Sequence, residues 1–236
     1  MLRSPTSRLS PIACLTVLAG LAVLAWDFSG LDLPLARWSG GPGGFPLQDE
    51  WFLTRVLHDG VRHLAWVLAL LLCLGVWFPA GWLGRLGFRR RLQLAVTTLV
   101  AVSLVTLARV TSHASCPWSL AEFGGVAHYV SHWSGWFVTD GGSGACFPAG
   151  HAAAGFAFVG GYFAFRHEAP GLARRWLATS LLVGLVLGVS QQMRGAHFMS
   201  HTLWTGWLCW CAAWAVDALM PRLKLGQLPG DLGEVA

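Results

Sequence analysis

Three polar segments of this sequence carry residues that can bind an anion and move protons: residues 109–118, 146–151 and 190–201. Residues 146–151 (CFPAGH) follow a Gly-rich stretch and precede an apolar run. Proline suits the first turn of a helix, because the N–H that it lacks would have no partner there. The backbone N–H groups of Ala149, Gly150 and His151 would then point out of a helix N-terminus, which favours phosphate. His151 also adds a group that gives or takes a proton near neutral pH.

The second set of residues supplies a nucleophile and positive charge. His197 and His201 are four residues apart, so they would share one face of a helix. A neutral imidazole at His197 can attack phosphorus to form a phosphohistidine, while His151 protonates the departing oxygen. Arg194 and Arg109 would hold the phosphate oxygens by charge-assisted hydrogen bonds. Because the arginines would supply the compensating charge, we expect no metal and no other cofactor.

Each of these residues has a structural alternative. A His pair at this spacing also occurs in zinc sites, but no carboxylate or third ligand of suitable spacing lies near it in the sequence. His128 and His132 have the same spacing in a Trp-containing loop, where we interpret them as solvated or interfacial. Arg194 could instead pair with a lipid head group. Arg109 could be a snorkelling residue at a helix end.

The composition places these segments in a membrane protein. Of 236 residues, 55% are hydrophobic and only 11% are charged, which is unlike a soluble domain. Several weakly charged segments approach the ~20 residues that a helix needs to cross a bilayer. We predict an all-α, polytopic membrane protein: a six-transmembrane-helix bundle forming one membrane domain over residues 1–236. The predicted spans are Pro11–Trp26, Val61–Phe78, Leu92–Leu107, Pro148–Phe165, Trp176–Val189 and Phe198–Leu219.

The basic residues orient this bundle. Eleven Lys and Arg residues fall on one side of the predicted membrane: Arg3, Arg8, Arg85, Arg89, Arg90, Arg91, Arg166, Arg174, Arg175, Arg222 and Lys224. The positive-inside rule therefore predicts cytoplasmic termini, with residues 221–236 as a flexible cytoplasmic tail. Topology and anionic lipid heads account for the net charge of +5, so we expect membrane contact and no nucleic acid. Residues 47–63 would form a short amphipathic helix at the outer interface.

The three polar segments fall on the outer side of this bundle. Polar and ionisable groups near membrane depth are costly, so they usually mark a functional site. Because three such segments would converge at one depth from non-adjacent helices, the sequence predicts a single site there.

The segments resemble the type-2 phosphatidic-acid phosphatase superfamily of membrane phosphatases over a core of roughly residues 92–215. This family has three short motifs, K-x6-R-P, P-S-G-H and S-R-x5-H-x3-D. Arg109 stands at the Lys position of the first motif, where Pro117 keeps the Pro and Cys116 replaces the Arg. Residues 148–151 (PAGH) match the second motif with Ala in place of Ser.

The third motif is matched with two replacements. Ser190 and His197 are in register, while Gln191 replaces the Arg and His201 replaces the Asp. The Asp of the family orients the nucleophilic His and stabilises its cation. His201 can accept a hydrogen bond but brings no negative charge, so the nucleophile should be weaker or its pH optimum shifted. Arg194, about one turn further along, is a candidate substitute for the missing Arg.

The resemblance implies that His197 is the nucleophile, that His151 is the general acid and that the active site faces outward. The substrate would be a phosphorylated membrane lipid: lipid A, undecaprenyl diphosphate or a glycerophospholipid. The pattern is similar to that of a bacterial subgroup, which implies the inner membrane with the active site facing the periplasm. Two alternatives stay open. One is a lipid phosphotransferase that uses the same intermediate, and the other is a degenerate, non-catalytic protein that binds or transports lipid.

Two cysteines lie beside the phosphate-site motifs. Cys116 and Cys146 are both in the outer loop, and the periplasm permits disulfides. We predict that they form a disulfide, closing a loop of about 30 residues worth roughly 3–4 kcal/mol in the chain-entropy model. This bridge would tie the first motif to the second.

Overall fold

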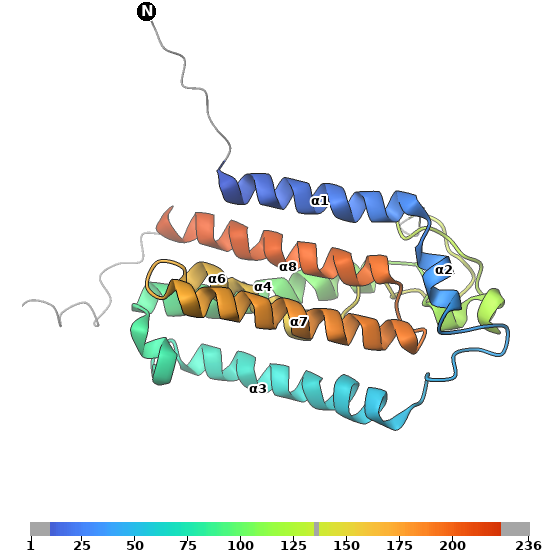
Figure 1. The fold of residues 1–236 in the computed structure, drawn as a ribbon, viewed down its shortest axis with the longest axis horizontal. Coiled ribbons are helices and arrows are strands. Elements are labelled where there is room, and N and C mark those ends of the chain that lie inside the picture. The colour runs from blue at the N-terminus through green and yellow to red at the C-terminus, as the bar shows by residue number, and fades with distance from the viewer. Residues whose placement is uncertain (1–9, 135–136, 223–236) are drawn as a thin grey trace, which may run out of the picture.

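A computed structural model describes residues 10–134 and 137–222 of the chain, and these residues form helices and no strand. Long helices lie side by side along the long axis of the molecule (Figure 1). They are α1 (Pro11–Ser29), α3 (Val61–Leu74), α4 (Phe88–Thr111), α7 (Pro170–Met193) and α8 (Met199–Leu219). The shorter helices are α2 (Asp32–Arg37), α5 (Ala153–Phe156), α6 (Gly160–Phe165), the π-helix η1 (Phe52–Gly60), and the 3-10 turns η2 (Gly81–Arg85), η3 (Pro117–Ser119), η4 (Ala121–Phe123), η6 (Ala157–Val159) and η7 (Met220–Arg222).

Helix α8 forms the centre of the bundle, because it packs against α1, α4 and α7. Small residues permit close packing of α7 against α5 and α8. A Cβ atom added at Gly155 in α5 would lie 2.2 Å from the backbone nitrogen of Gly184 in α7. A Cβ atom at Gly188 would meet the side chain of Thr202 in α8 at 2.1 Å. Close backbone approach at small residues is the usual way in which helices associate in lipid.

The chain is a membrane protein by the length and apolarity of its helices. Four helices of the described residues can span a bilayer: Pro11–Ser29, Phe52–Leu74, Phe88–Thr111 and Pro170–Met193. Ala153–Phe165 is a shorter apolar helix, and α8 contains four Trp residues and is not among the four. The predicted all-helical membrane architecture is confirmed, while the count of six spans stays a prediction. The predicted tail and the first basic residues lie largely outside the described ranges.

Two predicted boundaries were wrong. The separate interfacial helix over residues 47–63 does not exist, because η1 runs directly into α3 and extends that apolar helix outward to Phe52. The fourth helix begins at Ala153 and not at Pro148. The preceding turn is held against α8 because Ala149 donates its backbone N–H to the carbonyl oxygen of His201 at 3.2 Å. The Phe147–Pro148 peptide bond in this turn is cis.

The opposite end of the bundle carries a cluster of charges. Asp217, near the end of α8, accepts hydrogen bonds from Arg90 at 3.1 Å, Gln93 at 2.9 Å and Arg166 at 2.7 Å. These partners come from α4 and from the residue that follows α6. The basic residues that the sequence assigned to one side of the membrane therefore include a structural group that ties helix ends together.

Candidate active site

Three segments that are distant in sequence meet at one end of the bundle. In Figure 1, α4 and α7 end and α8 begins at this same end. Arg109 comes from the last turn of α4, Gly150 and His151 from the turn before α5, and His197 from the loop between α7 and α8. The ring centroids of His151 and His197 are 6.5 Å apart. A Cβ atom at Gly150 would lie 3.4 Å from Cδ of Arg109, so glycine lets this side chain lie against the backbone.

A cavity of about 330 Å³ opens beside Arg109, Gly150 and His151, while His197 is buried behind them and is not among the lining residues. Its polar end contains Arg109, Gly150 and His151, together with His58 and Arg62. The remaining wall is mainly apolar and includes Ala65, Trp66, Ala69, Leu99, Val102 and Phe158. A cavity with cations at one end and hydrocarbon along the rest suits a ligand with an anionic head and an apolar chain.

Two residues of the turn before α5, Gly150 and His151, line this cavity. The N–H groups of Gly150 and His151 donate to no acceptor within the described ranges, whereas the N–H of Ala149 is already bonded to His201. The expected anion site therefore keeps two of its three backbone donors. They lie in a turn and not at a helix N-terminus.

The sequence analysis missed His58. This residue is in η1, and its ring centroid lies 3.8 Å from that of His151. Its Nδ1 atom forms a hydrogen bond with Asp59 at 2.8 Å. Because His58 and Arg62 are four residues apart, helical spacing places them on one face. That spacing was the available signal, and it was overlooked because the segment was interpreted as interfacial.

Burial keeps both central imidazoles uncharged at neutral pH in the ligand-free protein. Burial lowers the pKa of His151 to about 3, with further lowering from His58, His197, Arg62 and Arg109. Burial likewise lowers the pKa of His197 to about 4, and the backbone of Cys146 partly opposes this shift. A neutral His197 has the lone pair that a nucleophile needs. Binding of a phosphate dianion beside His151 would raise the pKa of that residue toward the value that an acid needs.

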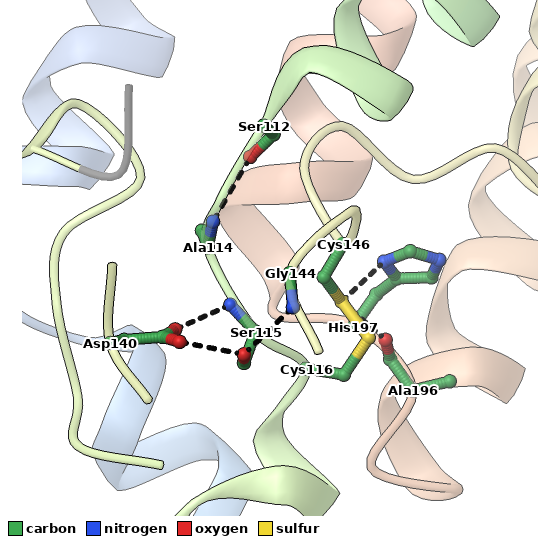
Figure 2. Close-up of a disulfide and its surroundings, with 9 residues drawn as sticks. All are labelled: Ser112, Ala114, Ser115, Cys116, Asp140, Gly144, Cys146, Ala196 and His197. Carbon is green, nitrogen blue, oxygen red and sulfur yellow. Dashed lines mark hydrogen bonds between the residues drawn. A yellow bond between two sulfur atoms is a disulfide. The ribbon is translucent and has the colours of Figure 1, made fainter. Parts of the chain in front are cut away.

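A disulfide joins the loop after α4 to the turn before α5. Cys116 and Cys146 are bonded, with their Cα atoms 5.2 Å apart, which is the pairing predicted from sequence. Figure 2 shows that Sγ of Cys146 also faces His197, at 3.5 Å from Nδ1. Beside the disulfide, Asp140 accepts hydrogen bonds from the N–H of Ser115 at 2.6 Å and from its Oγ at 2.8 Å. The bridge and this carboxylate together fix the loop over His197.

His201 lies in the first turns of α8 and is buried. Its ring centroid is 5.7 Å from that of His197, and its Nδ1 atom has no hydrogen-bond partner within the described part of the chain. His201 is thus close to His197 without a hydrogen bond to it.

Arg194 is directed away from the cavity. Its Nε donates to the carbonyl oxygen of Gln48 at 2.8 Å and its Nη1 donates to Oε1 of Gln191 at 3.1 Å. Arg194 does not line the cavity that contains Arg109. Arg194 therefore contacts Gln191, the residue that stands at the Arg position of the family motif. Its Nε is hydrogen-bonded to Gln48 in the outer loop.

The interpretation of His132 as a solvated or interfacial residue was wrong. Its ring is buried and stacks on Phe147 with centroids 4.1 Å apart. Its Nε2 atom lies 3.4 Å from a carboxylate oxygen of Asp27 in α1. Burial lowers the pKa of His132, and the carboxylate of Asp27 opposes that effect. His128, by contrast, is exposed.

The chemistry of the donor atoms disfavours a metal at the histidine pair. Within the described residues, one group of three potential ligands occurs here: Cys146, His197 and His201, with ligand atoms within 4.8 Å of one another. Because Cys146 is in the disulfide, it offers no thiolate, and two imidazoles fall short of the three protein ligands usual in a catalytic zinc site.

Comparison with known proteins gives one family. A family model described as the PAP2 superfamily matches residues 90–224, which is more than half of the chain. No curated protein and no solved structure matches the chain.

Proposed function

Because the chain belongs to the PAP2 superfamily, a family related to phosphatases, we propose that it hydrolyses a phosphorylated membrane lipid through a phosphohistidine at His197. The observation that carries this proposal is the meeting of His151 and His197 beside Arg109. Their rings are 6.5 Å apart, which leaves space between them for one phosphoryl group in contact with both. The apolar wall of the cavity supports a lipid as the substrate.

Binding comes first. Arg109 and the N–H groups of Gly150 and His151 would hold the phosphoryl oxygens, and charge-assisted bonds of this kind are the strong ones. His58 and Arg62 line the same polar end, where the guanidinium of Arg62 adds positive charge. The acyl or prenyl chain would occupy the apolar wall.

Phosphoryl transfer follows. The Nε2 lone pair of His197 forms a bond to phosphorus as the bond from phosphorus to the lipid oxygen breaks. His151, protonated once the dianion is bound, gives its proton to the departing oxygen, so the dephosphorylated lipid leaves neutral at that atom. Arg109 stabilises the charge that develops on the equatorial oxygens.

Hydrolysis completes the cycle. A water molecule attacks the phosphohistidine while neutral His151 accepts a proton from it, and the phosphorus–nitrogen bond breaks. Inorganic phosphate leaves, and His197 is again a neutral imidazole. As the phosphate leaves, His151 releases to solvent a proton equivalent to the one that it gained when the dianion bound, so both histidines return to the neutral forms of the ligand-free protein.

The proposal includes a location. We place the protein in a bacterial inner membrane with cytoplasmic termini and the site facing the periplasm. The grouping of basic residues at the end of the bundle opposite the histidines supports this orientation. The disulfide supports an oxidising compartment on the side of the site.

Phosphate release from a panel of lipids tests the function. Purified protein is given undecaprenyl diphosphate, phosphatidylglycerophosphate, phosphatidic acid and lipid A, each with a radiolabelled phosphate. We expect inorganic phosphate from at least one lipid, no release by His197→Ala, and unchanged release by the exposed control His128→Ala. Release by His197→Ala at the wild-type rate would refute the mechanism. Label appearing on a second lipid would identify a phosphotransferase.

A further inference from the structure

One side-chain contact of His197 determines which of its two ring nitrogens carries the lone pair. Nδ1 lies 3.5 Å from Sγ of Cys146, which is the one side-chain hydrogen bond of the ring within the described ranges, and the backbone of Cys146 also forms a hydrogen bond with His197. The same sulfur lies 3.0 Å from the carbonyl oxygen of Ala196. Cys146 and His197 are both buried, so water does not compete for the contact between Sγ and Nδ1 (Figure 2).

The chemistry of a disulfide sulfur makes this contact directional. A sulfur bonded to carbon and to a second sulfur carries lone pairs and no hydrogen, so it can only accept. A neutral imidazole that donates from Nδ1 carries its lone pair on Nε2. The contact therefore favours the tautomer in which Nε2 of His197 is the nucleophilic atom.

We propose that Cys146 is a positioning residue, whose Sγ orients the imidazole of His197 and holds it in the tautomer with Nε2 unprotonated. This inference rests on the proposed function for its catalytic consequence, but the tautomer itself is measurable without activity. It also assigns a second role to a cysteine that otherwise only closes a loop.

Among the residues that the structure describes, no other side chain takes this role. His201 stands where the resembled family has the orienting Asp, yet its ring centroid is 5.7 Å from that of His197 and no hydrogen bond joins them. The backbone of Cys146 also acts on His197. This backbone is common to all variants of Cys146, so side-chain substitution isolates the sulfur.

Two single variants separate the sulfur from the cross-link. Cys116→Ala and Cys146→Ala both abolish the disulfide, so both lower Tm by the same amount if the cross-link alone stabilises the fold. In Cys116→Ala the sulfur stays beside His197 as a thiol, which donates its S–H to the carbonyl of Ala196 and still accepts from Nδ1–H. In Cys146→Ala that acceptor is gone.

We expect Cys146→Ala to lower kcat on the order of 10-fold more than Cys116→Ala, with KM similar in both, because loss of tautomer control acts on the chemical step. Cys146→Ser should recover part of the loss, since a hydroxyl oxygen also accepts. Reduced wild-type protein, which keeps the sulfur without requiring a mutation, should behave like Cys116→Ala. Equal kcat in the two alanine variants, or reduced wild type as impaired as Cys146→Ala, would overturn the proposal.

Nitrogen-15 NMR of labelled histidine gives a readout independent of turnover. The His197 resonances, assigned with His197→Gln, should report protonated Nδ1 in the wild type and in Cys116→Ala, and a changed or mixed tautomer in Cys146→Ala. An unchanged tautomer in Cys146→Ala would refute positioning by the sulfur. If the wild type releases no phosphate while the tautomer still depends on Cys146, the proposed function fails and the positioning contact stands.

Discussion

When the ligand-free protein is acidified, His151 and His197 should stay uncharged at pH values well below the ordinary histidine pKa of 6.5. An ordinary histidine has a pKa of 6.5, and burial lowers that of His197 to about 4. The difference is 6.5 minus about 4, or about 2.5 pH units, which corresponds to about 3.4 kcal/mol favouring the neutral form. At pH 5 an unperturbed histidine would be about 97% protonated, whereas His197 would be about 10% protonated.

The sign of the effect on activity follows from the lone pair. His197 is nucleophilic above its pKa and is blocked below it, so its contribution to the acid limb of kcat/KM should fall near pH 4 and not near pH 6.5. Because the substrate phosphate itself titrates near pH 6, a direct titration is the cleaner measurement. In the same titration of the ligand-free protein His151 should also stay neutral far below pH 6.5, with a pKa of about 3 set first by burial.

Nitrogen-15 NMR of histidine-labelled protein from pH 8 to pH 4 shows whether either group becomes protonated within that range, with His151→Gln and His197→Gln for assignment. The exposed His128 provides the internal control. Inorganic phosphate should move the midpoint of His151 upward, because a bound dianion favours the imidazolium. Midpoints of 6 to 7 for His151 and His197 in folded, ligand-free protein would refute the argument from burial.

Two further predictions concern the anion site and the packing. Arg109→Gln should lower kcat/KM by about 10- to 150-fold, since a hydrogen bond to a charged group is worth about 1.5–3 kcal/mol; the exposed Arg174→Gln is the control, and equal kinetics in the two variants would count against a phosphate role. Gly155→Ala should lower Tm in a thermal melt, because the new Cβ would lie 2.2 Å from the α7 backbone and overpacking costs about 1–3 kcal/mol. Gly171→Ala, whose Cβ meets nothing within 4 Å, should leave Tm unchanged, and equal melting of the two variants would contradict the packing argument.

Local pattern was sufficient for several features of the protein. The length of the apolar runs predicts membrane-spanning helices, because crossing a bilayer requires about 20 apolar residues in sequence. The motif spacing around Arg109, His151 and His197 predicts the family, which the match over residues 90–224 bears out. The position of the two outer cysteines beside the motifs predicts the disulfide that the structure contains.

Contacts between distant segments determined the features of the site that local sequence patterns did not predict. His58 reaches His151 because η1 continues α3 past the expected boundary, and hydropathy alone does not distinguish that continuation from a separate interfacial helix. Arg194 turns toward a carbonyl 146 residues away in sequence, and the N–H of Ala149 pairs with His201.

The sequence by itself determined which residues can do chemistry and that the chain lies in a membrane, because residue type, spacing and apolar length are local properties. The tertiary structure alone decided which backbone donors of the turn before α5 remain unpaired and which atom faces Nδ1 of His197. Those outcomes depend on hydrogen-bond partners that folding brings from other helices, and no local pattern records them.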